Sequence, residues 1–456
     1  MNKMKMNIFL LATVLTGVLS QATAQQVVTS TSPASSGTQV RVAAEGREVR
    51  VINGENMRTT KNFKDEDLKT KEVSKEVSVP KGGEIYIENA SRNIIIKTWD
   101  QPKVKVTTTV YYDGESKLTD EEWLEKVNLS LKTLGSSVKV KSGSIGGSSF
   151  YSSGSGAFTY YGPGGSGSGV TVFNGTGQNV GTKANTKRIV TVTIPAGSKL
   201  DLESKYADVS VPAGITDASI DITNGNLEAE NLGKLVLRSR YSNVNVGDVK
   251  NAEIEFTNGR FSAKTINDLD IDSKYSTIEM AAVDKVVMRS TNDEYELEEA
   301  GDIRGRKSYG NLRITKLNNS IDLEGSNADI KIRKVGTALN QIKIDDKYAD
   351  IRIPLRDVKN YSVDFTGGYS SVYGNFEKKI PLTITEKTEN KTTKEAQAAE
   401  EKGQLKAITV EGIQTRPRTM TAWRDDNSPN LFTATVGDGK GLKIVMKCQN
   451  CTVDFK

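Results

Sequence analysis

The sequence predicts an all-β protein, a single-stranded β-solenoid (β-helix-like) of about 17-residue coils with a short helix and a flexible Gly/Ser-rich insert. Charged and polar residues alternate with valine, isoleucine and leucine over most of the chain, a pattern typical of strands with one buried and one solvated face. Glycine is frequent, with 40 residues, and proline is scarce, with 10, which favours extended structure joined by turns. Two turn motifs also recur at a fixed spacing.

The first motif carries a tyrosine that returns at an almost constant interval, at Tyr206, Tyr241, Tyr275 and Tyr309. The second lies midway between them, at Thr223-Asn224-Gly225, Thr257-Asn258-Gly259 and Thr291-Asn292-Asp293. One repeat unit is therefore about 17 residues long, and units stacked about 4.8 Å apart would hydrogen-bond to each other and bury an inward aliphatic row. Later turn positions are more widely spaced, which predicts wider coils or looser turns: Asn327, Tyr348, Tyr369.

The N-terminal segment 1–24 has the pattern of a secretory signal peptide. Lys3 and Lys5 precede an apolar run from Ile8 to Leu19 and a small-residue site at Ala22-Thr23-Ala24. No later segment approaches the roughly 20 apolar residues of a membrane-spanning helix. We therefore expect an exported protein of the periplasm, the outer cell surface or the medium, with no transmembrane segment in the mature chain.

The remaining chain is expected to contain a flexible leader at 25–69 and a β-solenoid at 70–456 with two inserts, at 113–186 and 386–404. In the first insert, Thr119-Asp120-Glu121-Glu122 has the spacing of a capping box and predicts a short helix. The Gly/Ser-rich stretch that follows has too few apolar residues to form a core. The last three predicted strands are expected to finish the stack: Leu431–Val436, Leu442–Met446, Thr452–Phe455.

The composition argues against the common catalytic machinery. Histidine is absent, which removes Ser-His-Asp and Cys-His catalysis and histidine-ligated metals. The net charge of +5 arises from 62 basic and 57 acidic residues with interspersed signs, so nothing indicates a nucleic-acid partner. We predict a protein that is not an enzyme, with no catalytic residue, cofactor or metal.

Aromatic residues in the Gly/Ser-rich insert are the first candidates for ligand contact, because exposed rings on a flexible chain suit weak binding. They are Phe150, Tyr151, Phe158, Tyr160, Tyr161 and Phe173. The recurring tyrosines are open to two interpretations: they pack at coil corners, or they present rings about 9.6 Å apart on which sugars stack.

Two carboxylate clusters are candidates for a cation or for acid/base work, although alternation would send Glu294, Glu296 and Glu298 to a solvated face. The clusters are Asp293-Glu294 with Glu296 and Glu298-Glu299, and Asp345-Asp346. Cys448 and Cys451 have thioredoxin-like spacing without a βαβ context, and in an oxidising compartment they predict a disulfide. Gly437-Asp438-Gly439 predicts a turn.

The Val77–Val110 segment, the helix-bearing insert, the polar turns and the stretch from Gly437 to Ile444 together resemble the DUF4097 adhesin-like (toastrack-like) family of secreted bacterial β-solenoid proteins. The resemblance covers about residues 70–456 and implies a fold without established catalytic residues. We predict a non-enzymatic exported interaction protein, adhesin-like or associated with the cell envelope, whose partner is an unknown glycan or envelope protein. Two alternatives stay open: a carbohydrate-active enzyme (polysaccharide lyase or hydrolase) on a β-helix, and an envelope-stress accessory protein that binds a membrane partner.

Overall fold

The computed structural model describes residues 68–80, 82–143, 169–380 and 430–456, together with three two-residue strands. The chain divides into two units, Met1–Thr59 and Thr60–Lys456. The first unit contains β1 (Val40–Arg41) and β2 (Arg50–Val51), which pair antiparallel. The second unit, which begins before β3 (Lys61–Asn62), contains everything described below.

The second unit is almost entirely β, with one sheet that has long parallel stretches. This confirms the predicted all-β class. Its N-terminal part contains strands in mixed directions: β4 (Lys69–Ser78), β5 (Glu84–Ala90), β6 (Asn93–Trp99), β7 (Lys103–Asp113), β8 (Leu129–Leu134), β9 (Ser137–Ser142), β10 (Val170–Asn174), β11 (Asn179–Lys183) and β12 (Ile189–Pro195). β4 pairs antiparallel with β7, whereas β6 pairs parallel with β12.

The one helix of the described residues is α1 (Asp120–Lys126), and it begins where the capping box predicts. The Thr119 hydroxyl accepts from the Glu122 backbone N–H, and the Glu122 carboxylate accepts from the Thr119 N–H. Trp123 on this helix is fully buried and packs against the ring of Phe173 from β10 at 5.6 Å between centroids. The cap fixes the start of the helix, and contacts of Trp123 with Phe173 and Tyr112 and the ion pair of Asp120 with Lys71 hold it against the sheet.

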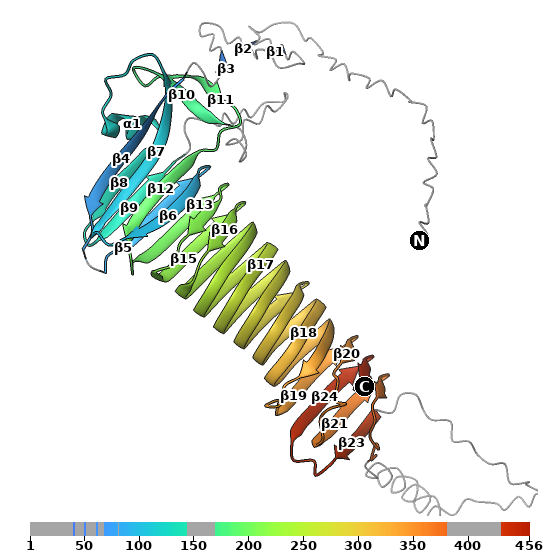
Figure 1. Ribbon diagram of the computed structural model, residues 1–456. Helices are drawn as coiled ribbons and strands as arrows, with labels where there is room; N and C mark the ends of the chain where they lie inside the picture. Colours follow the sequence, from blue (N-terminus) through green and yellow to red (C-terminus); the bar gives the residue numbers. More distant parts are fainter. Residues whose placement is uncertain are drawn as a thin grey trace, which may run out of the picture. The chain divides into compact units, whose positions relative to one another are not determined.

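From β13 onward the chain forms a regular parallel stack (Figure 1). Its strands are β13 (Lys199–Lys205), β14 (Val209–Val211), β15 (Ile215–Thr223), β16 (Asn226–Ala229), β17 (Leu232–Thr291), β18 (Glu294–Val335), β19 (Gln341–Lys347), β20 (Asp350–Arg352), β21 (Tyr361–Gly368) and β22 (Ser371–Tyr373). Ile220 pairs with Leu237 and Thr277 with Glu294, each one repeat unit further on, as the sequence predicts. β17 and β18 each contain several coils, and the chain turns the corners within them.

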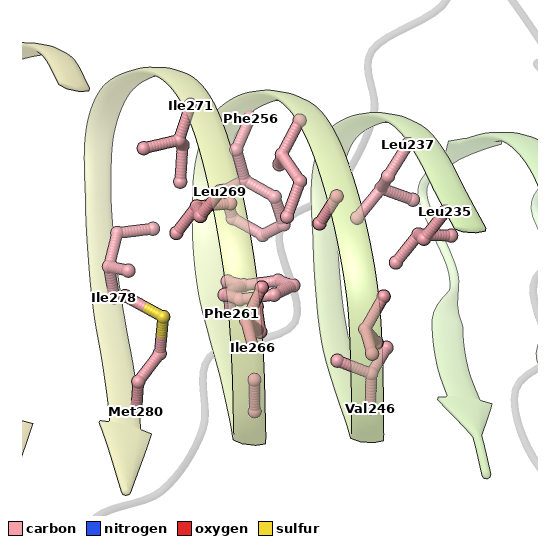
Figure 2. Close-up of a cluster of buried hydrophobic side chains, with 14 of the residues drawn as sticks. Leu235, Leu237, Val246, Phe256, Phe261, Ile266, Leu269, Ile271, Ile278 and Met280 are labelled. Atoms are coloured by element: carbon pink, nitrogen blue, oxygen red, sulfur yellow. The ribbon is translucent and has the colours of Figure 1, made fainter. Parts of the chain in front are cut away.

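Figure 2 shows the core of this stack, where aliphatic and aromatic side chains of successive coils point inward. Leu237, Ile254 and Ile271 occupy equivalent positions in successive coils and are all at most 1% exposed. Phe256 and Phe261 come from the two sides of one corner and meet edge to face, with 5.9 Å between ring centroids. The inward row of each coil therefore covers that of the next, which one coil alone could not do.

The C-terminal strands do not simply follow the stack, contrary to the sequence prediction. β24 (Leu442–Gln449) lies between β19 and β21 and pairs parallel with both, and β25 (Thr452–Asp454) likewise pairs with β20 and β22. β23 (Asn430–Val436) pairs antiparallel with β21. The longer step from Tyr348 to Tyr369 is thus not a wider coil, because a coil from the end of the chain is inserted between them.

Several predictions concern parts of the chain outside the described residues. These are the signal peptide at 1–24, most of the leader at 25–69, the Gly/Ser-rich stretch within 113–186, and the insert at 386–404. Among the helices of the described residues, none has the length and apolar character needed to cross a membrane.

Candidate functional site

The corners of the stack carry a column of alternating tyrosine and asparagine residues with left-handed backbone. We call it the tyrosine–asparagine column. The φ angles of its tyrosines lie between 50° and 62°, at Tyr206, Tyr241, Tyr275, Tyr309, Tyr348 and Tyr369. Those of its asparagines lie between 53° and 60°, at Asn224, Asn258, Asn292, Asn327 and Asn450. Asparagine tolerates this conformation well, whereas tyrosine adopts it at a cost in free energy.

Backbone hydrogen bonds order the column. The N–H of Tyr206 donates to the carbonyl of Thr223, just before Asn224, at 2.9 Å, and the N–H of Asn224 donates to the carbonyl of Arg240, just before Tyr241, at 3.0 Å. Each of these corner residues is thereby joined to the coil that follows it.

The same rule holds at the C-terminal end, across the inserted strand. The N–H of Tyr348 donates to the carbonyl of Gln449, and the N–H of Asn450 donates to the carbonyl of Gly368, both at 2.9 Å. Asn450 therefore stands between Tyr348 and Tyr369. Tyrosine and asparagine alternate in space along the whole column even where their order along the chain is interrupted.

The tyrosine side chains of the column point to solvent. The six residues are 46–62% exposed, so they lie at coil corners but are not packed there. At a coil spacing of about 4.8 Å, successive rings are about 9.6 Å apart and the column is about 48 Å long. Of the two interpretations the sequence left open, the exposed rings agree better with presentation than with packing.

Small residues directly after the corners keep the coils close together. A Cβ on Gly225 would overlap the backbone carbonyl of Ala207, and a Cβ on Gly259 would overlap that of Ser242. The Ser242 hydroxyl in turn accepts from the Gly225 N–H at 3.3 Å. The corner is therefore closely packed inside, and only the tyrosine ring or the asparagine amide projects outward.

The column carries side chains that suit binding. A phenol ring has an apolar face and a polar tip, and an asparagine amide donates and accepts hydrogen bonds. Rings at regular spacing separated by amides suit an extended ligand with repeated apolar faces and hydroxyl groups. No group of three or more Cys, Asp or Glu residues in the described ranges is arranged to hold a metal ion.

The acidic run at 293–299 is divided between the two faces of its strand. Arg313 pairs with Glu294 and Glu296, with N–O distances of 3.4 and 3.1 Å, on the solvated face that alternation predicts. Asp293 is instead buried, at 1% exposure. Its carboxylate accepts from the hydroxyls of Ser273 and Ser290 and from the N–H groups of Ser276 and Thr291, at 2.7–3.1 Å.

Lys307 completes this buried network. Its ammonium donates to Ser290 Oγ and to the carbonyls of Asp293 and Tyr309, and it lies 5.2 Å from the ring centroid of Tyr295. Burial lowers the pKa of Lys307 to about 8, against the attraction of the carboxylates of Asp293 and Glu294. The position two residues before the first three column tyrosines holds a buried serine instead, at Ser204, Ser239 and Ser273.

The second predicted carboxylate pair is also divided. Asp345 points to solvent, whereas Asp346 is 1% exposed, because adjacent residues of a strand face opposite ways. Asp346 Oδ1 accepts from the Lys347 N–H at 2.6 Å, but Oδ2 has no partner within the described residues. Burial raises the pKa of Asp346 to about 7.

Asp346 lies beside Cys448, its register partner on β24. Cys448 and Cys451 are both buried and are free thiols here. The hydrogen bond between the two thiols raises the pKa of Cys448 and lowers that of Cys451. The disulfide stays a prediction. The turn predicted at Gly437-Asp438-Gly439 is present between β23 and β24.

Of the six aromatic candidates in the Gly/Ser-rich insert, the structure describes Phe173. It lies in β10 and is 3% exposed, so it is a core residue and not an exposed ring on a flexible chain. Five lie outside the described residues: Phe150, Tyr151, Phe158, Tyr160, Tyr161.

The sequence identified all six column tyrosines as turn positions, four at an almost constant interval and two at wider spacing, but it did not indicate the role of Asn450. Asn450 lies within Cys448-Gln449-Asn450-Cys451, and the spacing of the two cysteines indicates a disulfide and not a corner of the stack. The left-handed backbone at the tyrosines also has no sequence signal, since tyrosine is not a residue that predicts it.

The fold and the column define a repetitive β protein with a linear, exposed aromatic surface. No protein-family model and no curated protein matches the sequence. A solved structure described as a "putative adhesin" from Parabacteroides distasonis is similar at 16% identity and a TM-score of 0.29, over 60% of this chain and 97% of that one.

Two further solved structures are similar to a lesser degree. A "putative lipid binding protein" from the same organism has 13% identity and a TM-score of 0.24, over 60% of this chain and 96% of its own. A "putative cell adhesion protein" from Clostridium sporogenes has 11% identity and a TM-score of 0.15, over 85% of this chain and 99% of its own. At these TM-scores the similarity carries no argument about fold or function.

Proposed function

We propose that this chain is a non-enzymatic, exported binding protein, adhesin-like in role, in which a single-stranded β-solenoid presents the tyrosine–asparagine column to an extended glycan. The signal-peptide pattern of residues 1–24 supports export, and the resemblance to the DUF4097 family supports the solenoid. The solenoid supplies the regular spacing, and the column supplies the contacts.

The left-handed tyrosines are the observation that carries this proposal. Six exposed tyrosines occupy a backbone region where a residue with a Cβ pays a cost of order 1 kcal/mol or more. The alternate corners show that asparagine fits the same place. The backbone conformation of these corners therefore does not require tyrosine, and strain kept at equivalent exposed positions is typical of a binding surface.

The ligand chemistry follows from the spacing. Rings about 9.6 Å apart are too distant to stack on one another, so a ligand can enter between neighbouring rings. The apolar faces of sugar rings can pack on the phenol faces, while the intervening amides can hydrogen-bond to hydroxyl groups. Of the acidic residues that a glycan-cleaving enzyme could use, Glu294 and Glu296 are paired with Arg313, and Asp293 and Asp346 are buried.

Replacing Tyr241, Tyr275 and Tyr309 together with asparagine should abolish most glycan binding without harming the fold. If each ring contributes about 1 kcal/mol, affinity should fall about 100-fold. The unfolding midpoint in urea should stay equal or rise, because asparagine adopts φ > 0 more readily than tyrosine. The measurement is retention on insoluble polysaccharides and isolated envelope fractions, beside unfolding of the same variants.

The matched control is Tyr373→Asn, which removes a 50% exposed tyrosine of β22 that is not part of the column. Its binding should equal that of the parent protein. Equal retention of the triple variant and the parent would contradict the proposal. If the parent protein binds no glycan but binds envelope proteins, and the triple variant loses that binding, the partner is a protein. Release of reducing ends from a polysaccharide would favour the enzyme.

A further inference from the structure

A small cavity at the N-terminal end of the stack is lined by basic groups and is distinct from the column. It has a volume of about 110 Å³, enough for a few water molecules or one small anion. Its apolar wall includes Val110, Val127 and Phe173, and its basic groups are Arg92, Lys187 and Arg188. None of the residues that line it is acidic.

The two arginines lie side by side because of strand register. β6 and β12 pair in parallel with Asn93 opposite Ile189, so Arg92 and Arg188, each one position earlier, lie next to each other just before these adjacent strands. The Asn93 N–H donates to the Arg188 carbonyl at 2.8 Å, which fixes this neighbourhood. The fold thus brings two like charges together from positions far apart in the sequence.

Arg92 is buried without a counter-ion among the described residues. It is 4% exposed, and it donates to the Val127 carbonyl and to Ser142 Oγ, both neutral acceptors. Burial, and then the charge of Arg188, lower the pKa of Arg92 to about 10, so the guanidinium is still charged at neutral pH. Buried charges in proteins are ordinarily paired, since an isolated one costs several kcal/mol.

Arg188 is half-buried and also lacks an acidic partner within the described residues. Its Nε donates to the Gly169 carbonyl at 2.8 Å, and Arg188 is one of the residues that line the cavity. Residues 144–168, which join Gly143 to Gly169, contain no acidic residue in the sequence.

We propose that this cavity binds a small oxyanion, a phosphate, sulfate or carboxylate group, between Arg92 and Arg188. A guanidinium presents a planar set of N–H donors that matches the oxygens of such groups, so two neighbouring guanidiniums can hold one anion between them. The group is either a free ion or the end group of a larger anionic molecule such as a lipid headgroup. The site does not depend on the function proposed for the column.

The first experiment is thermal unfolding of the purified protein with 0 to about 10 mM sulfate or phosphate, against sodium chloride at equal ionic strength. Binding to the folded state should raise Tm saturably, by about 2 °C or more, and chloride should not. The low concentration matters because sulfate at high concentration stabilises proteins without binding. A saturable rise is the expected result, and its absence overturns the proposal.

The variants locate the effect. Arg188→Gln should raise the half-saturating concentration at least about tenfold. Arg238→Gln, at an exposed arginine of β17 paired with Glu255, should leave it unchanged. Arg92→Gln should abolish the rise, and if this buried change prevents folding, Arg188→Gln still decides. An identical response of Arg188→Gln and the parent protein would overturn the proposal.

A third arm separates the two sources of the anion. Retention on phosphatidylcholine vesicles that contain phosphatidic acid, lost in Arg188→Gln and absent on phosphatidylcholine alone, assigns the group to a lipid headgroup. A saturable Tm rise without vesicle retention assigns it to a free ion. If the parent protein shows neither the Tm rise nor the vesicle retention, the proposed site is overturned.

Discussion

Replacing Asp293 with alanine is expected to lower the free energy of unfolding by about 3–5 kcal/mol, the usual cost of removing one partner from a buried ionic network. The carboxylate accepts four hydrogen bonds, from Ser273, Ser276, Ser290 and Thr291. Its removal leaves those donors without an acceptor and leaves the Lys307 ammonium without the nearby negative charge. Urea unfolding with hydrogen exchange over coils 273–309 would measure the loss.

The repeat itself supplies the control for this change. The preceding corners carry Thr-Asn-Gly and Ser-Lys-Tyr or Ser-Arg-Tyr, whereas the next two carry Thr291-Asn292-Asp293 and Lys307-Ser308-Tyr309. Asp293→Gly with Lys307→Ser and Ser308→Lys restores the common pattern and should recover most of the stability. Glu296→Ala, at an exposed acid, should cost less than about 1 kcal/mol. An effect of Asp293→Ala that is unchanged in a Lys307→Ser background would show that the two residues are not coupled.

Replacing Asp346 with asparagine should stabilise the protein above pH 7 and remove part of its pH dependence. The pKa of Asp346 is about 7 in the folded protein and 3.8 ordinarily, because burial disfavours the charge. The folded state therefore holds this proton more tightly than the unfolded state. Its stabilising contribution is complete below about pH 3.8 and is lost as the pH rises through about 7.

The size of this effect has an upper bound on the order of 4 kcal/mol, from the two pKa values. Asparagine has the shape of the protonated acid and no charge, so the variant should not lose stability between pH 4 and pH 8 through this position. Urea unfolding at several pH values, with Asp345→Asn as an exposed control, checks it. Parallel stability–pH curves for Asp346→Asn and the parent protein would refute this account.

The sequence predicted the parts of the fold that depend on local spacing. The interval between Tyr206 and Tyr241 implied the repeat unit, and Thr119 with Glu122 implied the helix start, because both signals lie close in the chain to the structure they specify. The tyrosines of the candidate site were found in the same way, though not their exposure or their left-handed backbone.

Long-range pairing was not predictable from spacing. No residue near Asn450 indicates that the preceding strand, β24, lies between β19 and β21. Likewise, no residue near Arg92 indicates that Arg188 lies beside it, because strands far apart in the chain create both contacts. Buried charge was missed for a related reason. Asp293 and Lys307 replace the usual glycine and serine at two successive corners, and the contact between them explains why both replacements occur.

The insertion of β24 also determines when one end of the molecule can be finished. A chain under synthesis can stack its coils in order up to β19, but the next strand that pairs with β19 is β24, at residues 442–449. Tyr361–Gly368 is made earlier and must wait for that strand, because β24 is its parallel neighbour. Closing so long a loop is slow relative to adding a coil, so this end should be the last part to become protected. A chain that stops before Leu442 would lose an inner coil and leave two strand edges open to other chains.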